Sequence, residues 1–555
     1  MRLVVVLLFF FVVLFGFSPI PSHAFSLAEQ VQGELVTLLE PVRATGKLIL
    51  ASGEVRLEPS IPDFYARRQG VPLWVGNHGP LPQARILLDA LRESSAEGLC
   101  PEDYHTERIA ELLALAEAMP RHGMLCEPCM MARLELLLTD AFLVYARDHL
   151  VGRMAFAHLR EAPELGDNET DPAILLEESL RGNRFAETLA ALVPKDPGYL
   201  RLMEQLEIYR GLAAAGGWPK VEPGETLRPG MRHDRVRQIK ERLQATSDRV
   251  WPENEPDDLL AGELLQAVRD FQALLGLEVD GVVGPATLAE LNVSVEERVR
   301  QIEWNLERWR WLPKPAPPRY LEVNIADFTM KVVDEGKTVM DMAVIVGTGY
   351  RKTPVFFGTM TYLELAPYWH VPPTILREDK LPLIRSNPGY LAQKNFEIVS
   401  WNNPAATIDP AGIDWSTVTA NNFPGALRQK PGPWNPLGRV KFMFPNRLAI
   451  YLHDTSARHL FKRRVRLFSS GCIRVERPFE LAHYLLEPQG WTEEELETAM
   501  NQRKPRQVSL REPLPIRILY WTAWVDDAGV MQFRPDYYQR DQDMQTALEL
   551  WRYRN

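Results

Sequence analysis

The sequence predicts a multidomain α+β protein, because its pattern of apolar residues changes twice along the chain. Residues 25–225 carry apolar side chains at the i, i+3, i+4 and i+7 spacing of half-buried helices. One predicted stripe is Leu134, Leu137, Leu138, Ala141, Phe142 and Tyr145, and a second is Tyr199, Leu200, Met203, Leu206 and Tyr209. Residues 226–293 carry three shorter helical stripes separated by turn residues. From about residue 319 onward, apolar runs typical of strands predict a mainly β domain.

The composition is that of a globular protein with several packed cores. The chain has 555 residues, of which 46% are hydrophobic, and a formal net charge of −10. This length suggests two to four domains. The mild acidity argues against nucleic acid as a partner. The 44 prolines, many of them in the C-terminal half, favour loops and strand edges over long helices there.

Residues 1–24 are predicted to be a signal peptide. Arg2 supplies one positive charge, an apolar run follows, and Ser22-His23-Ala24 is a small-x-small cleavage site. The apolar run is short for a membrane span. The alternative is an uncleaved anchor, and this segment is then the only expected contact with a membrane. In both cases the rest of the protein is exported.

The four cysteines fall into two groups. Cys126 and Cys129 form a CxxC in the helical half, and export places them in an oxidising compartment. A local disulfide, or a link from Cys100 to one of the pair, is favoured over a redox motif, because no βαβ pattern surrounds the CxxC. The pairing itself stays open. Cys472 is far from the others in sequence, which suits a separate role.

The region from 226 to 318 is predicted to contain short helices. Its apolar stripes are Val236, Ile239 and Leu243, and then Leu264, Ala267, Val268, Phe271 and Leu275. A third helix begins at Gly284-Pro285, because proline is favoured in a first helical turn. Residues 294–318 are predicted to form a connecting helix.

The stretch Phe468-Ser469-Ser470-Gly471-Cys472-Ile473-Arg474-Val475-Glu476 has the residue types of a thiol acyl-transfer enzyme. Such an enzyme needs a nucleophile, a base and donors for an oxyanion. Gly471 lets the backbone approach a substrate carbonyl, and its N–H and that of Cys472 can point at the oxyanion. Arg474 is expected either to bind a substrate carboxylate or to brace the loop by pairing with Glu476 or another carboxylate.

His453 is the candidate base for Cys472. Period-two alternation over residues 447–453 places Ala449, Tyr451 and His453 on one face of a strand, so Tyr451 and His453 are expected to face the same space. The alternatives are a Cys that is a small buried hydrophobe and a His that is structural.

His453 and Cys472, with Ser469-Ser470-Gly471-Cys472-Ile473-Arg474-Val475, resemble the catalytic signature of the L,D-transpeptidases, whose catalytic domain is called YkuD. Many members have a His before the Gly-Cys pair. Here Ser470 stands in that place, as in the large periplasmic branch of the family, and this leaves His453 as the base.

The resemblance extends over most of the chain and implies its domain boundaries. The segments at 64–74 and 98–104 resemble the N-terminal scaffold of the large L,D-transpeptidases, and residues 267–288 resemble the peptidoglycan-binding type 1 domain. The alternative for residues 267–288 is a structural spacer that no longer binds glycan. The expected parts are a signal peptide at 1–24, a helical scaffold at 25–225, a three-helix peptidoglycan-binding module at 226–293, the connecting helix at 294–318, the catalytic domain at 319–510 and a C-terminal extension at 511–555 that packs on the scaffold.

A long insertion is predicted within the catalytic domain at about 374–438. It has helix-like and Pro/Gly/Asn-rich pieces and no clear strands. Such an insertion is usually a lid or a binding loop, and the resemblance identifies it as a capping subdomain. Trp369, just before it, is expected either to wall the substrate channel or to be an ordinary core residue.

The resemblance implies an acyltransferase of the periplasm that acts in cell-wall organisation and cell shape. Cys472 attacks a tetrapeptide stem of peptidoglycan, D-Ala leaves, and a neighbouring stem accepts the acyl group in a 3→3 cross-link, without metal or organic cofactor. His453 is the base, and Tyr451, Ser470, Gly471 and Arg474 line the site. It also implies acylation of Cys472 by carbapenems and, as partners, peptidoglycan with possible cell-wall synthases. The alternatives are another acceptor (water, a D-amino acid or a lipoprotein lysine), an inactive wall-binding protein, and a CxxC redox protein.

Overall fold

The computed structural model describes residues 25–50, 53–119, 127–153, 170–247, 249–252, 256–403 and 405–554. The predicted signal peptide at 1–24 and Cys126 of the CxxC lie outside these residues, so both stay predictions. The chain divides into two compact units. One comprises Met1–Leu91, Glu102–Val144 and Leu176–Ala186, and the other comprises Arg92–Pro101, Tyr145–Leu175 and Glu187–Asn555. In the described part of the chain, no helix is long and apolar enough to cross a membrane.

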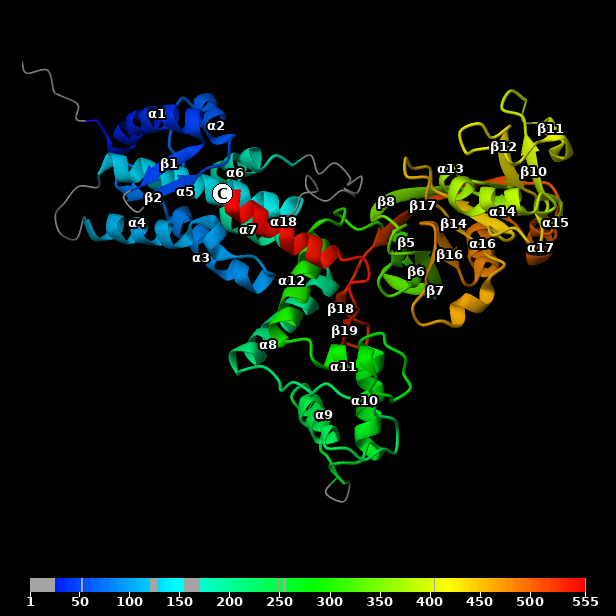
Figure 1. Ribbon diagram of the computed structural model, residues 1–555. Coiled ribbons are helices and arrows are strands. Elements are labelled where there is room, and N and C mark those ends of the chain that lie inside the picture. The colour runs from blue at the N-terminus through cyan, green and yellow to red at the C-terminus, as the bar shows by residue number, and fades with distance from the viewer. Residues whose placement is uncertain are drawn as a thin grey trace, which may run out of the picture. The chain divides into compact units, whose positions relative to one another are not determined.

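The N-terminal region is mainly helical, as predicted (Figure 1). Its first helix begins at a capping box, in which Ser26 and Glu29 each bond the other's backbone N–H. The α-helices are α1 Leu27–Thr45, α2 Ile61–Arg67, α3 Pro82–Glu93, α4 Thr106–Ala118, α5 Pro128–Leu150, α6 Pro172–Arg181, α7 Phe185–Leu192 and α8 Pro197–Ala214. Two small hairpins join them, β1 Lys47–Leu50 with β2 Gly53–Arg56 and β3 Val75–Gly76 with β4 Gly79–Pro80. The 3₁₀ turns are η1 Ser94–Glu97 and η2 Pro101–Tyr104.

The apolar stripes predicted for two of these helices differ in how well they hold. Helix α5 buries all the predicted positions, which are Leu134, Leu137, Leu138, Ala141, Phe142 and Tyr145. On α8, Leu200 is exposed and Leu202 is buried instead. The prediction for Leu200 was therefore wrong by about half a turn of helix.

The module at 226–293 has the three predicted helices, α9 Arg235–Gln244, α10 Gly262–Leu274 and α11 Pro285–Leu291 (Figure 1). They enclose one small apolar core, and Pro285 lies in the first turn of α11. The buried Gln272 side chain accepts from the Gly281 N–H and donates to the Val282 carbonyl, so it fixes the turn before α11. The connecting helix α12 Val295–Arg310 follows and begins at a second capping box, between Ser294 and Glu297.

The region from residue 319 onward is built on a nine-stranded sheet in the order β15-β7-β16-β14-β13-β8-β17-β5-β6. Strand β6 also pairs with β7, so the sheet closes on itself. The strands are β5 Arg319–Asn324, β6 Thr329–Asp334, β7 Lys337–Gly347, β8 Phe356–Leu365, β13 Val440–Met443, β14 Leu452–His453, β15 Leu467–Ser469, β16 Ile473–Val475 and β17 Arg506–Leu519. The helices α16 Pro478–Leu486 and α17 Glu493–Met500 follow β16, and η6 Arg458–Lys462 and η7 Glu487–Gln489 are short turns.

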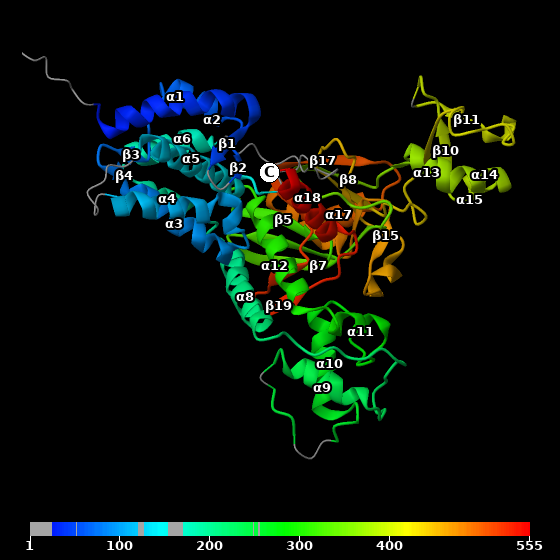
Figure 2. The ribbon, with the colours of Figure 1, turned by 60° about the vertical axis from the view of Figure 1, so that its left-hand side comes forward.

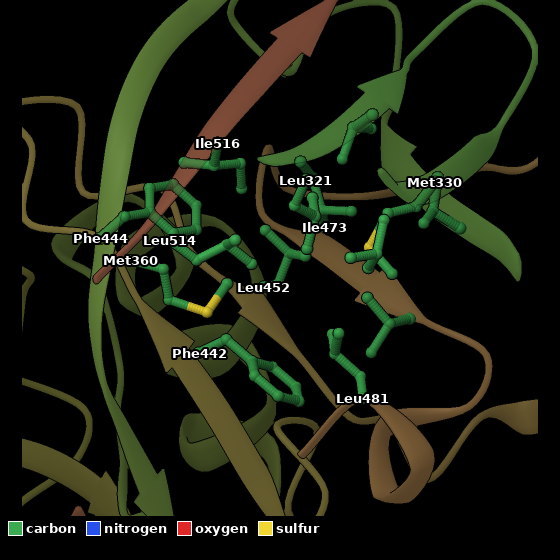
Figure 3. Packing of buried hydrophobic residues seen from close by; sticks show 14 of the residues in the cluster. Leu321, Met330, Met360, Phe442, Phe444, Leu452, Ile473, Leu481, Leu514 and Ile516 are labelled. Atoms are coloured by element: carbon green, nitrogen blue, oxygen red, sulfur yellow. The ribbon is translucent and has the colours of Figure 1, made fainter. Parts of the chain in front are cut away.

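The closed sheet encloses the main core of this region. Side chains from strands far apart in sequence point toward one another there, among them Leu321, Met360, Phe442, Leu452 and Ile473 (Figure 3). Leu452 and Ile473 are 0% exposed. Strand β14, which carries the predicted base, and strand β16, which begins directly after the predicted nucleophile, are therefore anchored from inside the sheet.

The capping insertion differs from its prediction, because it contains strands. β10 Phe396–Val399, β11 Thr407–Ile408 and β12 Ala426–Gln429 form a second sheet with β9 Trp369–His370, in the order β11-β10-β12-β9. These strands are too short to show a clear period in a sequence rich in proline and glycine. The insertion also has α13 Pro373–Ile375, the π-helix η4 Leu376–Lys380, α14 Leu381–Ser386, α15 Tyr390–Gln393, η5 Pro410–Gly412 and a core of its own (Figure 2).

The C-terminal boundary predicted at residue 511 falls inside a strand. β17 runs from Arg506 to Leu519 between β8 and β5, so residues 511–519 belong to the catalytic sheet and not to an extension. A hairpin follows, β18 Ala523–Val525 with β19 Met531–Phe533, and then helix α18 Arg540–Arg554. The hairpin shares an apolar cluster with α8 and α12.

Candidate active site

The pairing of β14 with β16 assembles the site. The two strands are parallel, with Leu452 opposite Ile473 and His453 opposite Arg474. Because side chains alternate along a strand and Leu452 and Ile473 enter the core, Tyr451, His453, Cys472 and Arg474 lie on the opposite face. The structure thus brings together four of the predicted site residues.

The strand predicted over residues 447–453 is much shorter than expected. Only Leu452 and His453 are paired as a strand, Ala449 has a φ of +54°, and Leu448 is exposed. Asn446 holds the preceding turn, since its side chain bonds the backbone of both Leu448 and Ile450. Tyr451 and His453 nevertheless lie together as predicted, with ring centroids 5.7 Å apart.

Cys472 is half-buried against the turn before β14. Its thiol donates to the Ala449 carbonyl, with Sγ 3.8 Å from the oxygen, and it accepts hydrogen bonds from the backbone and the side chain of Tyr451. Burial raises the pKa of this thiol, although the Tyr451 bonds and the charges of Lys441 and Arg474 act in the opposite direction. The thiol is therefore protonated at neutral pH, and a base must remove its proton when it reacts.

His453 is buried and uncharged at neutral pH. Its Nδ1–H donates to the Asp454 carbonyl over 2.5 Å, so Nε2 is the nitrogen that carries no proton in the neutral ring. The ring also has the Pro436 backbone as a hydrogen-bond partner. Burial, followed by the positive charges of Arg474 and Lys441, lowers the pKa of His453 to about 3. The Asp454 carboxylate is fixed in turn by the Arg439 N–H and by Arg458.

The predicted nucleophile and base do not bond each other directly. Within the described residues, the partners of the thiol are Ala449 and Tyr451, and His453 is not among them. Hydrogen bonds of catalytic groups are often long without substrate and tighten when it binds, so this geometry leaves His453 as the candidate base. The close contact of Tyr451 with the thiol was not anticipated from the sequence.

Two further charged residues lie on the same face and were missed by sequence reasoning. Lys441 on β13 is opposite His453 in register, and Glu364 on β8 is opposite Lys441. The Lys441 Nζ lies 3.3 Å from Glu364 Oε2 and 4.4 Å from the centre of the Tyr451 ring. The alternation in Lys441-Phe442-Met443-Phe444 was the signal that could have placed Lys441 on this face.

Gly471 and Ser470 occupy the loop before the nucleophile, and only one of the two predicted oxyanion donors is available. The Gly471 N–H donates to the Ser469 hydroxyl over 3.1 Å, so it does not serve an oxyanion in this structure. The Cys472 N–H has no acceptor in the described part of the chain. Gly471 has a φ of +115°, a conformation that glycine adopts without strain. The Ser470 hydroxyl accepts from Arg351 over 2.9 Å.

Arg474 does not form the predicted pair with Glu476. Its guanidinium reaches the Phe468 carbonyl at 3.5 Å, and its buried Nε has no partner among the described residues. Glu476 instead accepts from the Ala343 N–H. Of the two roles expected for Arg474, binding of a substrate carboxylate is the one that this geometry leaves open.

Of the two roles expected for Trp369, its position matches that of an ordinary core residue. It is 7% exposed and lies in the apolar cluster of the capping insertion, with its ring 6.0 Å from that of Phe396. Tyr451 packs against this cluster and also against the core of the large sheet. Tyr451 therefore forms one apolar link between the capping insertion and the neighbourhood of Cys472. Across the described residues, no group of three or more His, Cys, Asp and Glu side chains is placed to hold a metal ion.

Comparisons with known proteins identify relatives of three parts of the chain. Family models match a Scaffold domain over residues 59–206, a "Putative peptidoglycan binding domain" over 232–291 and an L,D-transpeptidase catalytic domain, YkuD, over 318–495. The chain is 36% identical over 259 residues to a "Putative L,D-transpeptidase" of Haemophilus influenzae. That match covers 46% of this chain and 52% of the relative, so the chain spans about half the length of that protein.

Two solved structures are also similar to parts of the chain. An L,D-transpeptidase from Xylanimonas cellulosilytica is 13% identical with a TM-score of 0.17, and the match covers 54% of this chain and 99% of that one. An L,D-transpeptidase from Stackebrandtia nassauensis is 11% identical with a TM-score of 0.20, over 54% of this chain and 96% of that one. Because these scores are low, the assignment rests on the family models and the sequence relative. Three parts of the chain therefore match known families: residues 318–495 match the L,D-transpeptidase catalytic domain, YkuD, and the segments before them match a Scaffold domain and a peptidoglycan-binding domain.

Proposed function

We propose that the protein is an L,D-transpeptidase that cross-links peptidoglycan through a thioacyl-enzyme on Cys472. The observation that carries the proposal is the placement of Cys472, Tyr451 and His453 on one face of β14 and β16. The match of residues 318–495 to the L,D-transpeptidase catalytic domain supports the same chemistry.

In the first half-reaction, Sγ of Cys472 attacks the carbonyl carbon between the third residue of a tetrapeptide stem and its terminal D-Ala. His453 Nε2 accepts the thiol proton and then delivers it to the amine of D-Ala, which leaves as the C–N bond breaks. The Cys472 N–H is the available backbone donor for the oxyanion. A thioester and free D-Ala result.

In the second half-reaction, the side-chain amine of the third residue of a neighbouring stem attacks the thioester carbon. His453 takes a proton from this amine, the C–S bond breaks, and the thiol recovers its proton. The product is a 3→3 cross-link. Arg474, which has no carboxylate partner in the described structure, supplies a cation for a carboxylate of the stem.

The charges at the site suit a reaction that starts from neutral groups. His453 holds no proton at neutral pH because burial lowers its pKa to about 3, while burial raises the pKa of Cys472. A stable thiolate–imidazolium pair is thus disfavoured before substrate binds. Lys441 and Arg474 place two positive charges near the sulfur, and these stabilise the thiolate as it forms.

The proposed setting is the periplasm, with peptidoglycan as substrate and partner. Domains that act on the cell wall point to an extracytoplasmic protein, and the predicted signal peptide at 1–24 supports export. We infer that the three-helix module holds glycan strands near the catalytic domain. A cell-wall synthase that delivers new strands is a further proposed partner.

Purified protein incubated with disaccharide-tetrapeptides, with products identified by mass spectrometry, tests this function. We expect free D-Ala and a 3→3 dimer from wild type, neither product from Cys472→Ala, and a rate at least about 100-fold lower for His453→Ala. Cys129→Ala is the matched control, because it removes a cysteine outside the site and leaves the products unchanged.

The same experiment separates the alternatives. Hydrolysed tripeptide or exchanged D-amino acid in place of dimer would identify another acceptor. Binding of wild-type protein to purified sacculi without any product would support an inactive wall-binding protein. Loss of function in Cys129→Ala with full function in Cys472→Ala would support the redox alternative.

A further inference from the structure

The loop before the nucleophile rests on a buried threonine that belongs to a different part of the sheet. Thr353 is 0% exposed. Its hydroxyl donates to the Gly471 carbonyl over 2.7 Å and accepts from the Gly347 N–H over 2.9 Å. One hydroxyl thus joins the end of β7 to the residue directly before Cys472.

The turn that carries Thr353 also touches this loop at a second point, because the Thr348 N–H donates to the Ser469 carbonyl over 3.1 Å. The turn is tightly closed at its base. A Cβ on Gly347 would lie only 2.0 Å from the Arg351 carbonyl oxygen, so residue 347 must be glycine for this path. The turn and the nucleophile loop therefore have one fixed relation in the folded state.

The C-terminal segment holds this turn from the other side. Tyr538 is 1% exposed, and its hydroxyl donates to the Gly347 carbonyl and accepts from the Thr353 N–H. The Lys352 ammonium donates to the Tyr538 carbonyl over 2.6 Å, and Arg540 donates to the Thr353 carbonyl over 2.9 Å. Tyr538 and Arg540 lie beyond residues 318–495, which match the catalytic domain.

Tyr538 is itself fixed by its neighbours. Its ring stacks on that of Tyr520, with centroids 5.6 Å apart and planes 13° apart, and its N–H donates to the Tyr520 hydroxyl over 2.8 Å. The Tyr520 hydroxyl donates in turn to Asp536 over 2.8 Å. A path of hydrogen bonds therefore runs from the segment before α18 to the Gly471 carbonyl, and it is buried from Tyr538 onward.

We propose that Thr353 and Tyr538 are positioning residues for the nucleophile, and that the C-terminal segment completes the active site by fixing the Gly471–Cys472 peptide. The proposal rests on the proposed acyl transfer at Cys472. The Gly471 carbonyl and the Cys472 N–H belong to one peptide group, so a bond that fixes the carbonyl also fixes the direction of the remaining oxyanion donor. Neither residue touches the substrate.

The test compares Thr353→Val, Thr353→Ser and Tyr538→Phe with wild type in the full chain. Tyr537→Phe is the matched control, because the Tyr537 ring packs on Phe328 and the Tyr537 hydroxyl has no hydrogen-bond partner among the described residues. Acylation of Cys472 by a carbapenem is followed by intact mass, and the melting temperature is measured for each variant. We expect Thr353→Val and Tyr538→Phe to be acylated about 10- to 100-fold more slowly. Thr353→Ser, which keeps the hydroxyl, and Tyr537→Phe should stay within about twofold of wild type.

A second readout keeps this inference separate from the proposed function. The rate at which iodoacetamide labels Cys472, measured by peptide mapping across pH, requires no transpeptidation. A loop released from Thr353 exposes the thiol, so Thr353→Val should shift the labelling profile to lower pH while Thr353→Ser leaves it in place. If wild type forms no 3→3 dimer but the labelling profile still shifts in Thr353→Val, the proposed function is contradicted and the positioning role of Thr353 is not.

Three results would overturn the inference. One is acylation of Thr353→Val and Tyr538→Phe at the wild-type rate. Another is an equal defect in Thr353→Ser and Thr353→Val, because the hydroxyl is then irrelevant. The last is a defect that appears only in variants whose melting temperature falls, which would indicate general destabilisation and not positioning.

Discussion

The two sides of the active site are held by different kinds of interaction. On the sheet side, Leu452 and Ile473 next to the proposed base and the proposed nucleophile are 0% exposed and packed in the main core. On the capping side, Arg351 joins the Ser470 loop to the insertion by pairing with Glu378 and Asp379, whose side chains are 41% and 43% exposed. The first side is fixed by burial and the second by ion pairs in water.

This difference indicates a division of labour. Packed apolar side chains tolerate little displacement, so the sheet can keep thiol, imidazole and backbone donor in register. Exposed ion pairs contribute little stability and weaken with salt, so the contact of the insertion with the Ser470 loop can open and change access to the site without displacing the thiol and the imidazole. Tyr451 packs against both cores and is the residue through which the two sides meet.

The largest expected effect concerns the thiol on the buried side. Because burial raises the pKa of Cys472, its alkylation by iodoacetamide should rise about tenfold per pH unit from pH 6 to pH 9, as the thiolate fraction does. Tyr451→Phe removes a hydrogen bond that lowers this pKa and should move the profile to higher pH. A plateau below pH 8 in wild type would show that the thiol is already ionised and contradict this description of the site.

The two cores can be weakened separately. Leu452→Ala should lower the free energy of unfolding of the catalytic domain by about 2–5 kcal/mol, because it leaves a cavity at a fully buried position, and it should change the labelling of Cys472. Ile384→Ala makes the same kind of cavity in the insertion and should leave the labelling profile unchanged. Denaturant unfolding and peptide mapping measure the two quantities. Equal disturbance of Cys472 by both variants would mean that the two sides are not independent.

Acid should act on the sheet side through His453. Its pKa is about 3 in the folded protein and about 6.5 in an unfolded chain, so between these values the unfolded chain binds more protons. The free energy of unfolding therefore falls as the pH drops through this window, by about 2 kcal/mol at pH 5. His453→Gln should lose less thermal stability than wild type between pH 7 and pH 5. The exposed His459→Gln variant is the control, and an equal loss in all three proteins would exclude His453 as the cause.

The smallest effect is expected on the capping side. Arg351→Met removes the pairs to Glu378 and Asp379 and should change stability by less than about 1 kcal/mol. It should also make the rate of carbapenem acylation insensitive to salt, since the ion pairs that salt screens are gone. Arg377→Met, which removes a neighbouring pair to Glu378, is the matched control and should keep the salt dependence of wild type. A persistent salt dependence in Arg351→Met would place the ionic contact elsewhere.

The sequence predicted well the features that depend on local periodicity. The stripe of α5, the three helices of the peptidoglycan-binding module and the shared face of Tyr451 and His453 all follow from spacing. The resemblance around Cys472 predicted the match of residues 318–495 to the L,D-transpeptidase catalytic domain.

Features that depend on pairing between distant strands could not be predicted in this way. Lys441 and Glu364 reach the site only through the register of β13 with β14 and β8. The support of the Gly471 carbonyl by Thr353 and the support from Tyr538 depend on contacts between segments far apart in sequence. The short strands of the insertion lack a readable period for the same reason, since each is defined by its neighbour in the sheet.

Intact-protein mass after incubation with a carbapenem tests the central claim most directly. Wild type, Cys472→Ala and His453→Ala would be compared under identical conditions, with Cys129→Ala as the control. The account predicts a single adduct on wild type and on Cys129→Ala, none on Cys472→Ala, and slow formation on His453→Ala. An adduct that persists in Cys472→Ala, or a folded wild-type protein that forms none, would contradict the assignment of Cys472 as the nucleophile of an active site.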